Sequence, residues 1–313
     1  MRICSFLPSA TEIVYALGLG DQLCGVTQGC DYPVEARAKP VVVRSILDGR
    51  ELSSEEIDRI VREHAHRGQS VYRIDLDALR AAAPDVILTQ ELCDVCAVGY
   101  QDVLAQVKIL PKPPHVLSLN PNTLEDVLED MLKVGETTGT SERGSKAVTA
   151  LRQRIENVRQ RAASATTQPR VFCLEWMEPL YVAGHWLPGM VEIAGGTDGL
   201  GGHGVPSARI TWEGVRDYQP EVVVLMPCGF DIPGIQRELK GLWTLPGWPE
   251  LQAVCDSRVY AVNGSAYFSR SGPRLVDGLE LLAQLVHPEI FPWTAPEDVA
   301  IRVQGPGLSK AGI

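Results

Sequence analysis

Residues 79–88 read Leu-Arg-Ala-Ala-Ala-Pro-Asp-Val-Ile-Leu, and residues 215–224 repeat the pattern as Val-Arg-Asp-Tyr-Gln-Pro-Glu-Val-Val-Val. In both stretches a helical segment ends, a proline followed by an acid turns the chain, and a short apolar strand follows. An acid also stands seven positions before each proline, Asp77 in the first half and Glu213 in the second. Since an internal repeat is most simply explained by two units of one architecture, the sequence predicts two similar α/β lobes.

Strand and helix patterns alternate on both sides of this repeat. Short apolar segments read as strands at 2–6, 23–26, 41–43, 86–88, 115–119, 170–174, 222–226 and 259–262. Helical patterns lie at 54–66, 76–82, 98–104, 188–194 and 273–285. Because alternating strands and helices favour parallel pairing, we expect a parallel sheet covered by helices on both faces in each lobe.

Two further expectations concern the ends of the chain. Ser9 and Glu12 have the Ser-x-x-Glu spacing of a capping box, which predicts a helix that starts there and ends at Gly18. The segment after Pro292 shows no periodicity, so we expect irregular structure in it.

The middle of the chain carries two longer helical patterns, at 123–134 and 145–163. The second is polar and has no interior glycine or proline, so it would run to roughly 30 Å at about 1.5 Å per residue. Such a helix suits a connector between two domains, although a surface helix of a single domain has the same pattern. We therefore expect an N-terminal lobe over 1–122, connecting helices and a linker over 123–168, and a C-terminal lobe over 169–313.

Composition narrows the class of protein. The chain of 313 residues is 45% hydrophobic and 22% charged, which is typical of a folded globular protein. Its formal net charge of −10 argues against nucleic acid as a partner. No apolar run approaches the roughly 20 residues of a membrane span. Met1 and Arg2 lead directly into a predicted strand rather than a signal peptide, so we expect a cytoplasmic protein, or a periplasmic or cell-surface one if a leader has been removed.

Ligands of open parallel sheets bind beyond the carboxyl ends of the strands, and this rule nominates the candidate site. The loops that follow the predicted strands are rich in sulfur, aromatic rings and a few charges. Their candidate ligand-binding residues are Pro8, Ser9, Cys30, Asp31, Tyr32, Glu91, Cys93, Glu175, Trp176, Cys228, Tyr267, Phe268 and Arg270.

Metal ligation is the second chemistry that the sequence suggests. Cys93 and Cys96 form a Cys-x-x-Cys pair, which fits a bound metal, a redox dithiol or two unpaired thiols. His185 lies in the turn Gly184-His185-Trp186, where it could ligate a metal, beside an indole that could cover a flat ligand. We therefore count Cys93, Cys96 and His185 as candidate metal ligands and Trp186 as a candidate ligand contact.

The sequence does not support any of three common enzyme motifs. Residues 199–204 have the letters of Gly-x-Gly-x-x-Gly but follow a helix end instead of a strand. Neither a phosphate-binding loop nor a Gly-x-Ser-x-Gly elbow occurs. Glu91 and Glu175 could act as acid and base, but no motif fixes their separation. A binding protein is thus favoured over an enzyme that uses Glu175 or Cys30.

An ordered set of motifs resembles a known family. It comprises Ser5-Phe6-Leu7-Pro8-Ser9-Ala10-Thr11-Glu12, Gly25-Val26-Thr27, Asp31-Tyr32-Pro33, Pro84-Asp85-Val86-Ile87, Glu192-Ile193-Ala194-Gly195-Gly196, Ser207, Trp212-Glu213, Phe268-Ser269-Arg270 and Gly272-Pro273-Arg274. From about residue 2 to 287 the chain resembles class III periplasmic binding proteins, and most of all the vitamin B12-binding receptors of ABC importers. The resemblance implies two α/β lobes joined by one rigid helix, for which 145–163 is the candidate.

The resemblance also implies a function. Such receptors hold a corrinoid between their lobes with aromatic side chains, and Tyr72, Tyr267 and Phe268 are candidates for these contacts. They dock on an ABC permease through one acid on each lobe, and Asp77 and Glu213 resemble these acids.

The chain also departs from the receptors. Cys30 stands where they place an aromatic residue before the Asp-Tyr-Pro turn. The cysteine-rich loops are similar to a subgroup labelled cobalamin-binding that lacks a secretion signal. The leading hypothesis is a binding protein that holds cobalamin, another corrinoid or a related metal chelate in the cleft between its lobes. The alternatives are a cytoplasmic protein with a cysteine-bound metal or iron–sulfur site, and an enzyme that uses the same cleft.

Overall fold

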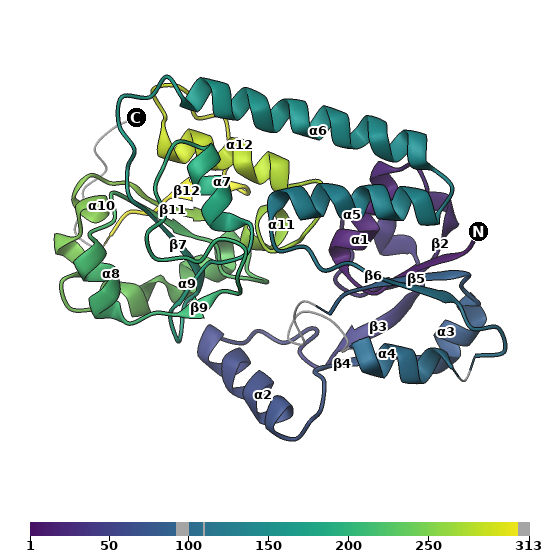
Figure 1. The fold of residues 1–313 in the computed structure, drawn as a ribbon. Coiled ribbons are helices and arrows are strands. Elements are labelled where there is room, and N and C mark those ends of the chain that lie inside the picture. Colours follow the sequence, from purple (N-terminus) through teal and green to yellow (C-terminus); the bar gives the residue numbers. More distant parts are fainter. Residues whose placement is uncertain (92–99, 109, 306–313) are drawn as a thin grey trace. The chain divides into compact units, whose positions relative to one another are not determined.

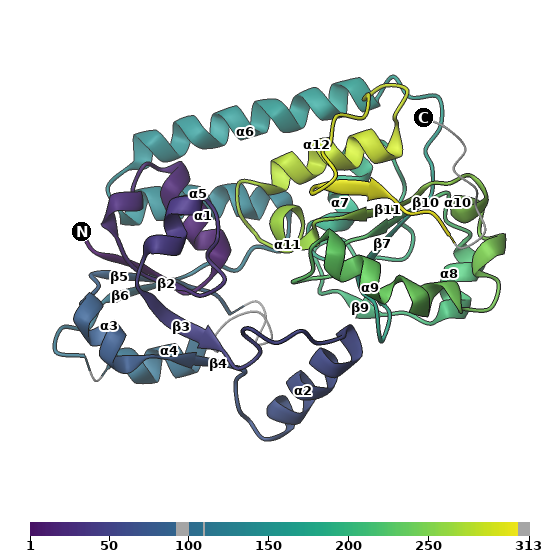
Figure 2. The same ribbon diagram turned by 180° about the vertical axis from the view of Figure 1, so that it is seen from behind.

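The computed structural model describes residues 1–91, 100–108 and 110–305 and contains two compact α/β units (Figures 1 and 2). The first unit takes in residues 1–121, 125–151 and 271–273, and the second takes in 122–124, 152–270 and the chain from 274 onward. The division falls inside one continuous helix, α6 (Ser141–Ala162). Two lobes and a long helix that continues from one into the other confirm the predicted fold class.

The first lobe is built on a six-stranded sheet of order β4-β3-β2-β1-β5-β6. Its strands are β1 (Ile3–Ser5), β2 (Leu23–Thr27), β3 (Val41–Ser45), β4 (Tyr72–Ile74), β5 (Val86–Thr89) and β6 (His115–Ser118). Its α-helices are α1 (Pro8–Ala16), α2 (Ser54–His66), α3 (Leu76–Ala82), α4 (Tyr100–Val107) and α5 (Leu124–Thr137), with short 3-10 helices at Gly20–Gln22 and Val34–Ala38. Within this lobe α1 and α5 cover one face of the sheet, and α3 and α4 cover the other (Figure 1).

The second lobe carries another six-stranded sheet, of order β12-β11-β10-β7-β8-β9. Its strands are β7 (Val171–Trp176), β8 (Tyr181–Val182), β9 (Ala208–Arg209), β10 (Val222–Leu225), β11 (Val259–Val262) and β12 (Ala300–Arg302). Its helices are α7 (Leu187–Ile193), α8 (Trp212–Tyr218), α9 (Ile232–Trp243), α10 (Gln252–Cys255), α11 (Gly264–Tyr267) and α12 (Leu275–Val286), with a 3-10 helix at Trp248–Glu250. Helices α7 and α12 pack together on one face, and α9 lies on the other (Figure 2).

Both sheets are mixed rather than purely parallel. The central strands pair in parallel, as the alternation of strands and helices predicts, but β4, β8, β9 and β12 pair antiparallel at the edges. The central strands are buried on both faces, and every residue of Val222–Leu225 is fully buried. This is why they read as continuous apolar runs instead of alternating patterns.

The repeat identified in the sequence has a structural counterpart. Helices α3 and α8 each have seven residues, and their N-cap residues Asp75 and Thr211 each accept a hydrogen bond from a backbone N–H three residues later. Both helices end at a non-glycine residue in the left-handed conformation, Ala83 with φ 41° and Gln219 with φ 50°. A proline and an acid follow, and then a buried strand. The two halves therefore share this helix–turn–strand unit.

Two local predictions were wrong. Helix α1 begins at Pro8, and Leu7 occupies the N-cap position without a side-chain cap, so Ser9 and Glu12 form no capping box. Proline takes the first helical turn because its fixed φ suits that position. A capping box does occur at Ser53 and Glu56, at the start of α2. The segment after Pro292 is not wholly irregular, because it forms β12, which pairs antiparallel with β11.

Helix α6 is tied to each lobe by an arginine. In the first lobe, Arg143 donates a hydrogen bond of 3.3 Å to the carbonyl oxygen of Leu17. In the second lobe, Arg154 pairs with Asp277 at 2.6 Å and with Glu280 at 2.7 Å, both on α12. These polar contacts add to the apolar face of the helix, on which Val148, Leu151 and Val158 are buried.

Candidate functional site

Several polar and aromatic residues gather where β7 and β10 of the second lobe end. We call Glu175, Trp176, Ser207, Cys228 and Phe230 the second-lobe cluster. Because β7 and β10 are adjacent and parallel, their carboxyl ends meet at one edge of the sheet. The backbone N–H of Cys228 donates to the carbonyl oxygen of Glu175 at 3.1 Å, which joins the two strand ends directly.

Glu175 is the acidic centre of this cluster. The hydroxyl of Ser207 donates to its Oε2 at 2.6 Å, and the backbone N–H of Gly184 donates to the same hydroxyl at 3.1 Å. Burial raises the pKa of Glu175, and the hydrogen bond from Ser207 opposes that rise. The neutral, protonated form of Glu175 is therefore favoured more than in a solvated carboxyl.

Trp176 supplies a partly exposed aromatic surface next to this carboxyl. Its ring meets Phe230 edge to face at 5.7 Å between centroids. Its indole N–H donates to the carbonyl oxygen of Glu178 at 3.1 Å, so the polar atom of the ring is already satisfied. The remaining surface of the indole is suited to contact with a flat apolar ligand.

His185 and Trp186 lie in one turn but have different surroundings. His185 adopts φ 51°, stacks on Trp186 at 5.5 Å, and its buried Nδ1 has no hydrogen-bond partner among the residues that the structure describes. Burial lowers the pKa of His185, which favours the neutral imidazole. Trp186 is buried, and its indole N–H donates to the carbonyl oxygen of Phe268 at 2.9 Å. Phe268 is also buried, so these two aromatic rings belong to the core of the second lobe.

Tyr267 and Arg270 follow β11 in the same lobe. Both are partly exposed. The guanidinium of Arg274 lies over the ring of Tyr267, 4.5 Å from its centroid, so one face of that ring is covered by a cation.

In the first lobe, the candidates that follow β1 and β2 occupy small polar contacts. Pro8 and Ser9 form the first turn of α1, and Ser9 is buried and accepts a hydrogen bond from the hydroxyl of Ser271 at 3.4 Å. Cys30 is buried, with its sulfur 3.0 Å from the hydroxyl of Thr11. Asp31 and Tyr32 are exposed.

Other first-lobe candidates lie at the ends of β3, β5 and β6. Tyr72 pairs with Ser45, the last residue of β3, so it lies at the carboxyl edge although it starts an antiparallel strand. Glu91 is exposed, and its backbone N–H donates to Oδ1 of Asn120 at 2.6 Å. Asn120 in turn contacts Ser118, which ends β6.

Cys93 and Cys96 lie outside the described residues. Within the described ranges, no three His, Cys, Asp or Glu side chains are grouped as a metal site would require. The structure adds Thr11, Asn120 and Phe230 to the strand-end residues. Of these, Phe230 could have been found from its place in the loop after β10.

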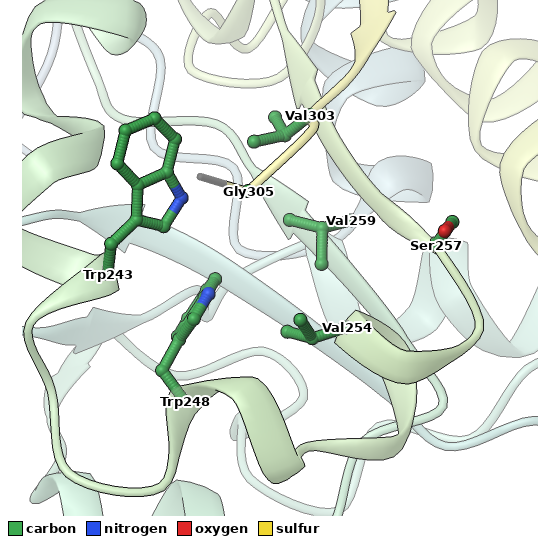
Figure 3. Close-up of a pocket in the computed structure, with 7 residues that line it drawn as sticks. All are labelled: Trp243, Trp248, Val254, Ser257, Val259, Val303 and Gly305. Carbon is green, nitrogen blue, oxygen red and sulfur yellow. The ribbon is translucent and has the colours of Figure 1, made fainter. Parts of the chain in front are cut away.

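A hollow in the second lobe lies away from the carboxyl end of β11. It is lined by Trp243, Trp248, Val254, Ser257, Val259, Val303 and Gly305 (Figure 3). Val259 is the first residue of β11, so the hollow lies at the amino end of that strand. Ligands of parallel sheets bind at the opposite end, and the hollow is therefore not the candidate site.

Comparison with known proteins identifies the class. A sequence profile described as periplasmic binding protein matches residues 3–266. The chain belongs to this family. Among its relatives, an uncharacterized ABC transporter substrate-binding lipoprotein of Bacillus subtilis is 24% identical over 93% of this chain and 81% of the relative. Vitamin B12-binding proteins are 25% identical in Vibrio cholerae, over 89% and 86% of the two chains, and 27% identical in Photorhabdus laumondii, over 91% and 87%.

Solved structures of the family share the fold. A periplasmic heme-binding protein from Pseudomonas aeruginosa gives a TM-score of 0.73 at 22% identity, covering 97% of this chain and 99% of the other. The periplasmic vitamin B12 binding protein of Vibrio cholerae gives 0.66 at 24% identity, covering 91% and 96%. At this identity the likeness establishes the architecture alone.

Family membership shows that the predicted location of the protein needs correction, and it bears on the choice between a binding protein and an enzyme. The prediction of a cytoplasmic protein was wrong, since the family and its relatives are periplasmic binding proteins or lipoproteins, which points to an extracytoplasmic location. Membership in a family of binding proteins also favours binding over catalysis. None of the described helices is long and apolar enough to cross a bilayer.

The two acids nominated for docking occupy equivalent positions in the repeat. Asp77 lies in the first turn of α3 and Glu213 in the first turn of α8. Both are exposed, and Asp77 pairs with Arg80 at 3.0 Å. Each lobe thus has an exposed acid in the first turn of the corresponding helix, where the helix dipole favours negative charge.

Proposed function

We propose that this protein is the receptor of an ABC-type importer and that its ligand is a corrinoid, with cobalamin as the first candidate. The observation that carries the proposal is family membership together with relatives named vitamin B12-binding protein, which match most of both chains. The partly exposed Trp176, close to the Glu175–Ser207 pair, supports a ligand that is flat and apolar with polar groups at its edge.

The proposed ligand contacts come from strand-end loops. In the second lobe, Trp176 and Tyr267 would contact the flat face of the macrocycle, and Ser207 and Glu175 would hydrogen-bond to groups at its edge. Tyr72 is the candidate aromatic contact of the first lobe. His185 is the candidate ligand for the chelated metal ion, because its imidazole is held in the neutral form. The metal in this proposal arrives with the ligand and is not a resident ion of the protein.

Equilibrium dialysis tests which class of ligand the protein binds. Purified protein is dialysed against cobalamin and, in a separate arm, against hemin, each at about 100 μM, where a receptor of roughly micromolar affinity is close to saturation. We expect one cobalamin per chain and a shifted visible spectrum. No cobalamin binding at this concentration would refute the proposal, and saturable binding of hemin alone would reassign the ligand.

A matched pair of tryptophan variants tests the site. Trp176→Ala should weaken cobalamin binding at least tenfold because it removes a stacking surface. Trp293→Ala is the control, since Trp293 is also partly exposed and its indole N–H also donates to a backbone carbonyl two residues later. Equal affinities for the two variants would remove Trp176 from the proposed site.

The permease is the proposed partner, and Asp77 and Glu213 are the proposed docking residues. Asp77→Lys and Glu213→Lys together should leave cobalamin binding unchanged and abolish ligand uptake in cells that carry the cognate permease. Uptake at the wild-type rate would show that docking does not use these acids.

A further inference from the structure

Two cysteines on adjacent central strands of the first lobe face each other. The Sγ atoms of Cys4 on β1 and Cys24 on β2 are 3.7 Å apart. Gly25 lies beside them, and a Cβ atom on it would meet Cys4 Sγ at 2.7 Å. The absence of a side chain at Gly25 therefore leaves room for the Cys4 thiol against β2.

The two thiols differ in access to solvent. Cys4 is fully buried, whereas Cys24 is partly exposed. A reagent in solution can therefore reach Cys24 first, while Cys4 can react only with a group already attached at Cys24. This asymmetry matches an attacking thiol and a resolving thiol.

We propose that Cys4 and Cys24 are a modification site that closes to an intramolecular disulfide when the protein meets a low-molecular-weight disulfide as oxidant. The Cys24 thiolate attacks one sulfur of the reagent, forms a mixed disulfide and releases the other half as a thiolate. Cys4 then attacks Cys24 Sγ and releases the second half. The reagent is reduced to two thiols, which take up the two protons that the cysteines lose.

Electrostatic surroundings support this order of events. The hydrogen bond with Cys4 lowers the pKa of Cys24 to about 7, which favours the thiolate of Cys24 over that of an ordinary cysteine. Arg2 adds a smaller lowering effect, and burial and the charge of Asp85 oppose it. The pKa of Cys4 is raised by its hydrogen bond with Cys24 and by burial, which favours its neutral thiol.

The first experiment maps the bridge in the wild-type protein. The reduced protein is incubated with oxidised glutathione under chelator, alkylated and digested. Cys4, Cys24 and Cys30 share one tryptic peptide, residues 3–37, so a second cleavage after Glu12 is needed to separate Cys4 from the other two. We expect peptides joined through Cys4, with fragmentation placing the link at Cys24 and not at Cys30. If Cys4 is still a free thiol and becomes alkylated although Cys24 has reacted, the proposal is overturned. A disulfide found only between Cys93 and Cys96 overturns it as well.

Variants test the assigned roles. Cys24→Ser should abolish the bridge to Cys4, and Cys4→Ala should leave one glutathione on Cys24 as a stable mixed disulfide. Cys255→Ser is the control because Cys255 is exposed on α10, in the other lobe, and should not affect the bridge. Circular dichroism confirms that each variant is folded before it is scored. A bridge to Cys4 that persists in folded Cys24→Ser contradicts the assignment.

Discussion

Glu221 accepts a hydrogen bond of 2.9 Å from the backbone N–H of Arg170, and Asp85 accepts one of the same length from the backbone N–H of Arg2. In each lobe the acid after the proline thus binds the arginine that immediately precedes the neighbouring central strand. The side chain of each arginine makes a second contact in the same region. Its Nε donates to a carbonyl oxygen at the end of the helix that precedes the proline, α3 in the first lobe and α8 in the second. The repeat therefore extends from the sequence pattern to individual hydrogen bonds.

The Glu221 contact should contribute measurably to stability. Glu221→Gln replaces an ionised acceptor by a neutral one at the start of β7, and we expect it to lower the free energy of unfolding by about 1 kcal/mol. Urea unfolding monitored by tryptophan fluorescence measures this. Glu297→Gln, an exposed acid outside the sheet, is the control and should be neutral.

The ion pairs of Arg154 should contribute more to stability than the ion pair of Arg159 on the same helix. Arg154→Met removes contacts with both Asp277 and Glu280, and we expect a loss of about 1 kcal/mol that shrinks at high salt, since the three groups remain partly exposed. Arg159→Met, which loses one exposed pair with Glu156, should change stability by less than about 0.5 kcal/mol. Equal effects of the two variants would show that Arg154 does not anchor the helix.

Two glycines should respond to alanine in opposite directions. A Cβ on Gly184 would overlap backbone atoms of Val205, Pro206 and Ser207, so Gly184→Ala should be severely destabilising. Gly241 lies within α9, and apart from its chain neighbours and the backbone of that helix no atom of the described residues comes within 4 Å of the position that an added methyl group would take. Gly241→Ala should therefore raise stability by about 0.5–1 kcal/mol through helix propensity. Thermal unfolding of both variants checks the pair.

The contribution of Glu175 to the stability of the protein should fall as the pH rises. The pKa of Glu175 is raised in the folded protein, so its carboxyl is most favourable to folding below its ordinary pKa of 4.5 and becomes less so as pH rises through the raised value. Glu175→Gln removes this titration. The stability of the variant minus that of the wild type should therefore increase from pH 4.5 upwards, as unfolding titrations at several pH values can show. A difference that stays constant or falls would contradict the raised pKa.

Local signals explain which parts of the fold could be predicted. The turn Pro84-Asp85 and its partner at Pro220-Glu221 are encoded within a few residues, and the central strands are uniformly apolar, so both lobes were predictable. Strand β12 was not, because three residues at a sheet edge depend on pairing with β11 rather than on any local pattern. Ser9 looked like a helix cap, but its hydroxyl contacts Ser271, which is far away in the sequence.

In the candidate site, too, the features that local sequence determines were predictable, and those that depend on long-range contacts were not. The rule that ligands bind at the carboxyl ends of strands selected Glu175, Trp176 and Cys228, whose strand ends are adjacent in the structure. The bond between Glu175 and Ser207 spans 32 residues and depends on how a glycine-rich loop folds back, which no spacing rule encodes. The surroundings of His185 depend on long-range packing in the same way.

The return of residues 271–273 to the first lobe has a consequence for how the protein is made. Gly272 lies so close to α1 that a Cβ on it would be 3.4 Å from the carbonyl oxygen of Ser9. A nascent chain released from the ribosome only as far as α6 still lacks this piece of its first lobe. The first lobe can therefore be completed only after residues 271–273 have been translated, and a first-lobe fragment that lacks them would leave that surface of α1 bare.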